Sequence, residues 1–176
     1  MLVASSYDHR SASVVKRAIR SSAGWKPLSL FYSRTLHLFD RAVFRLTRGR
    51  ATFTSWLAGL PVAWLTTTGA KSGVERTSPV LAIPAGDGRL IVIASNYGQD
   101  RNPSWYHNLR KNPGARILFD GGEHEMVARE LDGDERARWY ARGIEIYPGW
   151  VQYAKRAPRK IPVIELRPPD ASPAAG

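Results

Sequence analysis

Short apolar segments rich in β-branched residues recur along the second half of the chain, and glycine-containing turns separate them. This pattern predicts β-strands over residues 62–68, 76–83, 89–95, 115–120, 123–131 and 161–166. Gly86-Asp87-Gly88 and Asp120-Gly121-Gly122 are residue types that tight hairpin turns require. Because most connections are this short, an antiparallel meander is favoured over a parallel sheet. The predicted fold class is α+β: a small antiparallel β-barrel with peripheral helices.

A second pattern, with apolar residues three or four positions apart, predicts helices. The longest covers residues 27–48 and is amphipathic, and residues 10–20 form a shorter basic candidate. The apolar face of 27–48 carries Leu28, Phe31, Thr35, Phe39, Ala42, Val43 and Leu46, and the opposite face carries Arg34, His37, Arg41, Arg45 and Arg48.

Two more helices are expected between the strands. One takes Asn102 as N-cap and Pro103 as first helical residue, and ends at Asn112-Pro113. The other runs from Asp132 to about residue 147, and Asp132 and Glu135 have capping-box spacing. In the first helix, one-turn spacing predicts Trp105 and Leu109 in the core, with Tyr106 and His107 directed elsewhere.

At 176 residues the chain is expected to form one domain over residues 26–167, between a basic extension (1–25) and a disordered tail (168–176). Its net charge of +11 is uneven, since ten basic and two acidic side chains place +8 within residues 1–50. Helix 27–48 therefore either packs on the barrel or contacts an anionic membrane surface. Nucleic acid is the weakest partner, because the basic residues follow one helix face without aromatic residues between them.

Several classes of chemistry are disfavoured by the composition. The chain has no cysteine, which excludes disulfides and thiolate catalysis, and its four histidines lack the spacing of a metal site. No run of about 20 apolar residues and no secretory signal is evident. We expect a cytoplasmic protein without a bound metal, either free or peripheral at the inner face of the cell membrane.

The turn Gly69-Ala-Lys71-Ser72-Gly73 joins two predicted strands. Lys71 in the turn and Arg76 at the start of the next strand are its two cations. Its backbone amides, the Ser72 hydroxyl and the Lys71 ammonium can converge on a phosphate, with Arg76 as a planar clamp from the next strand. The alternative is an ordinary hairpin with solvated basic residues. The spacing is not that of a P-loop.

Several motifs in order resemble the deazaflavin-dependent nitroreductase and quinone reductase family over roughly residues 40–167. They are the turn followed by Arg76-Thr-x-Pro79, then Ala94-Ser-Asn-x-Gly98, Pro103-x-Trp-Tyr-x-Asn-Leu109, Tyr147-Pro-Gly-x-x-x-Tyr153 and Ile161-Pro-Val. The resemblance implies an FMN-binding-like split β-barrel that uses reduced coenzyme F420, a hydride carrier, to reduce a quinone or nitro compound.

The resemblance also implies roles for particular residues. The cofactor-binding set would be Lys71, Ser72, Gly73, Arg76, Pro79, Ser95, Asn96, Trp105 and Asn108. The acceptor would lie against Tyr147, Trp150 and Tyr153, where close family members tend to carry a tyrosine in place of Trp150. Tyr153, Ser95 or solvent would then deliver the proton. Read without the family, Trp105 is better explained as a core residue than as a cofactor contact, and the three aromatic residues are equally well explained as core.

Two other functional classes stay open. One is an FMN- or haem-binding split-barrel protein, because the same fold hosts different cofactors. The other is a basic module that binds membrane or nucleic acid and rests on the charge alone. A monomer and a homodimer are both compatible with the sequence.

Overall fold

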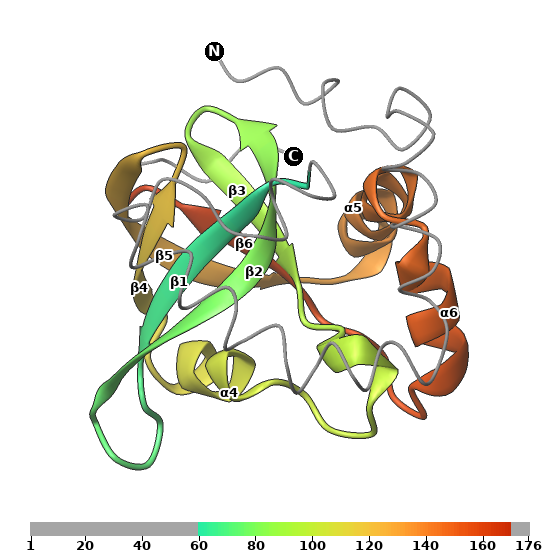
Figure 1. The fold of residues 1–176 in the computed structure, drawn as a ribbon, viewed down its shortest axis with the longest axis horizontal. Helices are drawn as coiled ribbons and strands as arrows, with labels where there is room; N and C mark the ends of the chain where they lie inside the picture. Colours follow the sequence, from blue (N-terminus) through green and yellow to red (C-terminus); the bar gives the residue numbers. More distant parts are fainter. Residues whose placement is uncertain (1–59, 170–176) are drawn as a thin grey trace.

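The computed structural model describes residues 60–169, which form a closed six-stranded antiparallel barrel with three α-helices (Figure 1). The strands are β1 (Val62–Thr68), β2 (Glu75–Gly86), β3 (Arg89–Ile93), β4 (Gly114–Phe119), β5 (Gly122–Leu131) and β6 (Val163–Arg167). Their order around the barrel is β1-β2-β3-β6-β5-β4, so β6 closes the gap between β3 and β5. The antiparallel barrel expected from the sequence is confirmed.

The helices are α4 (Ser104–Lys111), α5 (Gly133–Ile146) and α6 (Gly149–Arg156), with a 3₁₀ turn η2 (Asn96–Gly98) after β3. Alternate side chains of the strands fill the barrel, and Trp105, Tyr106 and Leu109 of α4 join this interior cluster. The opposite face of β2, β3 and β6 packs against α5 and α6 in a second cluster. Figure 1 shows α5 and α6 on the right of the barrel and α4 below it.

Three local predictions about the helices are wrong. Pro103, not Asn102, is the N-cap of α4, because its extended backbone (ψ 153°) lies outside the helix. Asp132 is the N-cap of α5 but makes no capping hydrogen bond through its side chain, and Glu135 pairs with Arg129 instead. Tyr106 is buried rather than directed outward, because the barrel end accepts its ring while its hydroxyl donates to Glu130 on β5.

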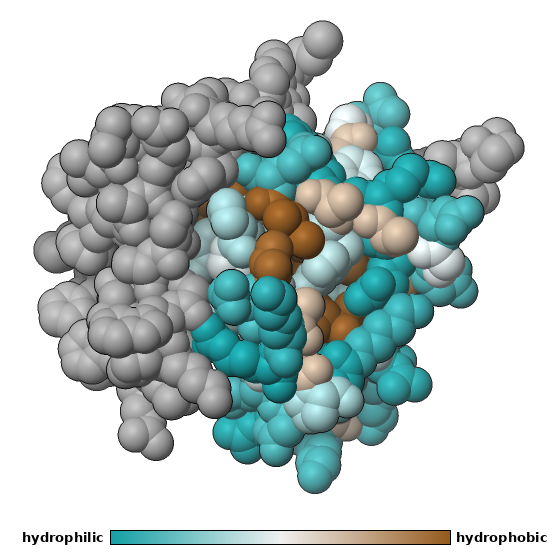
Figure 2. All heavy atoms as spheres, turned by 90° about the vertical axis from the view of Figure 1, so that its right-hand side faces the viewer, coloured by the Kyte–Doolittle hydropathy of each residue, from teal (hydrophilic) through white to brown (hydrophobic). Residues whose placement is uncertain are grey.

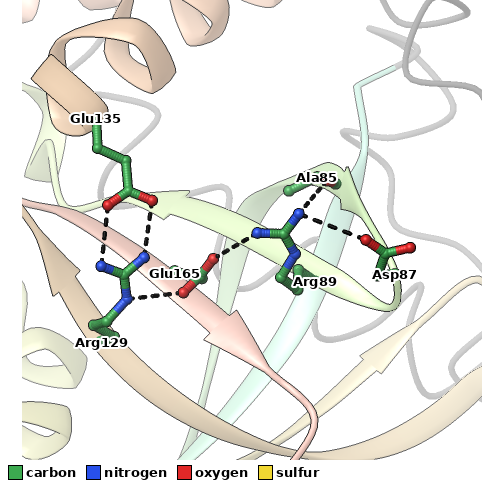
Figure 3. Close-up of polar contacts among 6 residues, drawn as sticks. All are labelled: Ala85, Asp87, Arg89, Arg129, Glu135 and Glu165. Atoms are coloured by element: carbon green, nitrogen blue, oxygen red, sulfur yellow. Dashed lines mark hydrogen bonds and ion pairs between the residues drawn. The ribbon is translucent and has the colours of Figure 1, made fainter. Parts of the chain in front are cut away.

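A buried carboxylate links three strands and α5 on the outer face of the barrel (Figure 3). Glu165 of β6 accepts hydrogen bonds from Arg89 at 3.2 Å and from Arg129 at 3.0 Å. Arg129 also forms a two-pronged pair with Glu135, at 2.8 and 3.0 Å, and this pair lowers the pKa of Glu135. The network fixes the start of α5 against the sheet.

The basic extension 1–25, the predicted helix 27–48 and most of the predicted tail 168–176 lie outside the described residues. Between residues 60 and 169, no helix is long and apolar enough to cross a membrane.

On the side that carries α5 and α6, Figure 2 shows apolar residues gathered in a hollow among hydrophilic ones.

Candidate active site

The turn between β1 and β2 is held by its own backbone. Gly69 donates to the carbonyl of Val74 at 2.9 Å, and Gly73 donates to the carbonyl of Gly69 at 2.8 Å. Gly73 has a φ of +69°, which favours glycine, and a Cβ on Gly69 would lie 2.7 Å from the Ser72 hydroxyl. Both glycines are therefore required by the turn that presents Lys71 and Ser72 at its exposed tip.

Asn108 of α4 anchors this turn to the barrel. Its buried side-chain amide accepts a hydrogen bond from the backbone of Ala70 at 2.9 Å and donates one to the hydroxyl of Thr67 at 3.0 Å. Lys111, one turn further along α4, donates to the carbonyl of Ala70 at 2.6 Å. Asn108 thus uses both groups of its amide on the protein, and this geometry makes it a support of the turn.

The exposed side of the turn has the donors that a phosphate needs. Lys71 and Arg76 are both exposed, and neither has an ion-pair partner among residues 60–169. Glu75 lies between them in the sequence, but Arg116 holds its carboxylate through two hydrogen bonds of 2.8 Å. The nearest acid is therefore already neutralised, and two cations and the tip amides of Lys71 and Ser72 are available to an anion. The residues present fit a phosphate-bearing cofactor.

The loop after β3 places Ser95 beside α6. The indole nitrogen of Trp150 donates to the Ser95 hydroxyl at 3.2 Å. Asn96 and Tyr97 both have positive φ, at 45° and 57°, and the side chain of Asn96 donates to the carbonyl of Arg101. Gly98 lies against α6, since a Cβ there would be 2.9 Å from the backbone of Tyr153. The backbone of this loop is thus strained and enclosed.

The aromatic residues of α6 and the segment before it form one buried group next to Ser95. The hydroxyls of Tyr147 and Tyr153 are 2.9 Å apart, and the rings of Tyr147 and Trp150 meet edge to face at 5.6 Å. Burial raises the pKa of Tyr147, helped by the neighbouring Tyr153, and burial also raises the pKa of Tyr153. Both phenols therefore stay protonated at neutral pH.

The predicted site residues fall into two groups and two outliers. Lys71, Ser72, Gly73 and Arg76 lie at the β1–β2 end of the barrel with Asn108 bonded to the turn, whereas Ser95, Asn96, Tyr147, Trp150 and Tyr153 lie at the junction of β3 and α6. In Figure 1 the hairpin projects at the lower left, η2 and α6 lie at the right, and α4 lies between. Pro79 is half-buried and pairs with Trp64 in the β1–β2 register, and Trp105 is a buried member of the interior cluster. Whether these residues touch a cofactor stays a prediction.

Two supporting residues, Lys111 and Arg159, have roles that the sequence pattern does not reveal. Arg159 donates to the carbonyls of Ala94, Ser95 and Gln99, which lie about 60 positions earlier in the chain. Nothing in the local pattern around Arg159 signals such a contact, because its acceptors are backbone atoms in a distant loop.

A closed antiparallel barrel with a cationic hairpin and a protonated aromatic group is the frame of a cofactor-dependent oxidoreductase of the split-barrel class. Residues 39–168 match the family model of F420H(2)-dependent quinone reductase, and the chain belongs to this family. The resemblance drawn from the motifs is confirmed, and the cofactor of the family is coenzyme F420.

Relatives and solved structures agree. A putative F420H(2)-dependent quinone reductase of Mycobacterium tuberculosis is 36% identical over 62% of this chain and 91% of its own length. An F420H(2)-dependent quinone reductase of the same organism is 35% identical over 74% of this chain and 88% of its own length. The solved structure of an F420-H2 dependent reductase covers 61% of this chain and 94% of that one at 35% identity, with a TM-score of 0.56.

A second solved structure bears on oligomeric state. It is described as a domain-swapped dimer and is 31% identical, with a TM-score of 0.58 over 72% of this chain and 95% of that one. For the present chain, monomer or homodimer stays a prediction.

Proposed function

We propose that this protein transfers a hydride from reduced F420 to a quinone, with the cofactor phosphate on the 69–76 hairpin and the acceptor beside Ser95 and α6. The observation that carries the assignment is the pair of exposed cations without an ion-pair partner among residues 60–169, Lys71 at the hairpin tip and Arg76 at the start of β2. The acid between them in the sequence, Glu75, is already paired with Arg116. When bound, reduced F420 supplies the hydride, so the protein needs no nucleophile of its own. That matches a chain without cysteine.

The hairpin holds and orients the anionic end of the cofactor. Lys71 offers a point charge, Arg76 offers a planar fork, and the amides of Lys71 and Ser72 offer directed hydrogen bonds. Because Asn108 and Lys111 tie the hairpin to α4, these donors are already in place before the cofactor arrives. Such preorganisation reduces the ordering cost of binding.

The group formed by Ser95, Tyr147, Trp150 and Tyr153 would stabilise the negative charge that develops on the quinone oxygen during hydride transfer. Trp150 donates to the oxygen of Ser95, so the Ser95 hydroxyl keeps its own proton for donation. The raised pKa values of Tyr147 and Tyr153 keep both phenols as proton holders rather than phenolates. Donors fixed in a buried site stabilise developing negative charge better than water does. We expect the proton of the product to come from Tyr153, Ser95 or solvent.

The first test compares cofactors and the cations of the hairpin. Purified protein is titrated with F420 and with FMN by fluorescence, and oxidation of reduced F420 by a soluble naphthoquinone is followed by absorbance. We expect F420 to bind more tightly than FMN. Lys71→Ala and Arg76→Ala should each weaken F420 binding by about 1.5 to 3 kcal/mol, the range for charge-assisted hydrogen bonds.

A matched control removes an exposed cation elsewhere. Arg138 is exposed on α5, and Figure 1 shows α5 at the upper right, away from the hairpin at the lower left. Arg138→Ala should leave F420 affinity unchanged. Equal affinity in wild type, Lys71→Ala and Arg76→Ala would reject the hairpin as the phosphate site, and preference for FMN or haem would favour the other class of split-barrel protein.

We also propose that the predicted helix 27–48 contacts the membrane surface, where a lipid-soluble quinone is found. The support is its sequence pattern alone, with an apolar face opposite Arg34, Arg41, Arg45 and Arg48. Flotation with anionic liposomes at low salt tests it. Flotation should be lost when these four arginines are changed to glutamine, and failure of the wild type to float would mean that the helix packs on the barrel.

A further inference from the structure

The backbone of the 94–99 loop has an unusual conformation for a segment that carries a functional hydroxyl. Asn96, Tyr97 and Gly98 have φ values of 45°, 57° and 76°, so three consecutive residues lie in the left-handed region, and two of them are not glycine. Such backbone persists only where surrounding structure enforces it. The position of Ser95 therefore depends on what holds this loop.

Within the loop, hydrogen bonds are few and short in range. Ser95 donates to the carbonyl of Ile93, Gly98 donates to that of Ser95, and Gln99 donates to that of Asn96. On the α6 side, Trp150 reaches the Ser95 side chain and Gly98 contacts the backbone of Tyr153. These contacts fix the α6 side of the loop, and on the other side the backbone of Ala94 donates to the carbonyl of Pro162 at 2.9 Å, which fixes the first residue of the loop only.

Arg159 holds the other side. It lies in the segment between α6 and β6, and its guanidinium donates to Gln99 O at 3.2 Å, to Ala94 O at 3.2 Å and to Ser95 O at 3.0 Å. The three acceptors come from both ends of the loop, so one planar side chain fixes their separation. Burial lowers the pKa of Arg159, and among residues 60–169 no carboxylate forms a salt bridge with it. The hydrogen-bond partners of the guanidinium are therefore these three backbone carbonyls.

We infer that Arg159 is a positioning residue for hydride transfer: by holding both ends of the 94–99 loop, it sets the place of the Ser95 hydroxyl. This inference rests on the proposed function for its kinetic part only. The hydrogen bonds of Arg159 all go to the Ser95 loop, whereas the phosphate hairpin is held by Asn108 and Lys111. Because the hairpin would provide the charged contacts to F420, the loss of Arg159 should change turnover far more than cofactor affinity.

The variants are Arg159→Gln, which removes the fork, and Arg159→Lys, which retains the charge but has a single donor nitrogen. Arg136→Gln is the matched control. Arg136 also donates through Nε and Nη2 to a backbone carbonyl, that of Ile161, but it makes no contact with the loop. Arg136 therefore makes the same type of interaction as Arg159, but it holds Ile161 and not the 94–99 loop.

The first measurement needs neither cofactor nor acceptor. Hydrogen exchange followed by mass spectrometry should show the amides of residues 94–99 exchanging about tenfold faster in Arg159→Gln than in wild type, with β1 unchanged. Arg159→Lys should fall between them, and Arg136→Gln should match wild type in this loop. Unchanged exchange at 94–99 in both Arg159 variants would overturn the inference, whatever the enzyme's activity proves to be.

The second measurement is kinetic. Arg159→Gln should lower kcat by about tenfold to a hundredfold, the loss expected from a small displacement of a reacting group, while the Kd for F420 changes less than about twofold. Arg159→Lys should recover part of kcat. Equal losses of kcat and F420 affinity, or equal kcat losses in Arg159→Gln and Arg136→Gln, would mean general destabilisation and reject positioning. If Arg159→Gln does not fold, the same comparisons are decided with Arg159→Lys.

Discussion

Replacing Asn108 with leucine should loosen the phosphate hairpin without removing any group that faces solvent. Leucine has the same number of side-chain heavy atoms as asparagine but leaves the amide of Ala70 and the buried hydroxyl of Thr67 without their partner. An unsatisfied buried polar group costs about 1 to 3 kcal/mol. Two such groups together would cost about 2 to 6 kcal/mol. Because the Ala70 amide is only partly buried, we expect the free energy of unfolding to fall by about 2 to 4 kcal/mol, the lower half of this range.

Lys111→Met supplies the comparison on the same helix. Lys111 makes one hydrogen bond, of 2.6 Å, to the carbonyl of Ala70, and it is exposed. Its loss should cost only about 0.5 to 1 kcal/mol, because water replaces an exposed interaction. The two variants therefore remove contacts with the same turn residue, and burial alone predicts the larger effect for Asn108.

Urea unfolding with a constant m-value gives the stabilities, and fluorescence titration gives F420 affinity. We expect Asn108→Leu to lose both stability and affinity, since a mobile hairpin must be ordered again on binding. Full stability combined with lost affinity would mean that Asn108 contacts the cofactor directly. A stability loss below about 0.5 kcal/mol with unchanged affinity would refute the anchoring role.

Three further changes test other parts of the structure. Tyr153→Phe should lower turnover at nearly constant F420 affinity, as measured by steady-state kinetics and titration, because its hydroxyl acts only as charge develops; unchanged turnover would leave Tyr153 as packing. Gly98→Ala should reduce both melting temperature and kcat, because the added Cβ would lie 2.9 Å from the Tyr153 backbone and the residue has a φ of +76°. Gly121→Ala is the control: Gly121 also has a positive φ, but no atom lies within 4 Å of the added Cβ, so only stability should fall. Glu165→Gln should cost about 2 to 4 kcal/mol in urea unfolding, because two guanidiniums lose their shared carboxylate, and a cost below about 1 kcal/mol would mean that water screens the network.

The sequence predicted the strands well because a half-buried strand leaves a local signature. The β1 segment could be placed to the residue. Strand ends were less exact. β2 continues to Gly86 because pairing with β3 extends it, and β3 stops at Ile93 because the backbone turns at Ser95.

Side-chain direction was harder to predict wherever the partner lies on another element. Tyr106 has the pattern of an outward residue on α4, yet Glu130 on β5 and the barrel end provide its environment. Glu135 has capping-box spacing with Asp132, but Arg129 on β5 competes for its carboxylate with two hydrogen bonds. In both cases a polar partner on a neighbouring strand outweighs the local preference.

The chemistry of the candidate site follows the same division. Composition and motif order alone determined the family, the cationic hairpin, and the aromatic residues at 147, 150 and 153, because residue types and short spacings carry that information. Only the tertiary structure decided that Arg116 neutralises Glu75, that Asn108 supports the hairpin, and that Arg159 holds the Ser95 loop. Each of these contacts joins residues about 40 or more positions apart, and barrel closure, which no local pattern encodes, is what brings them within hydrogen-bond distance.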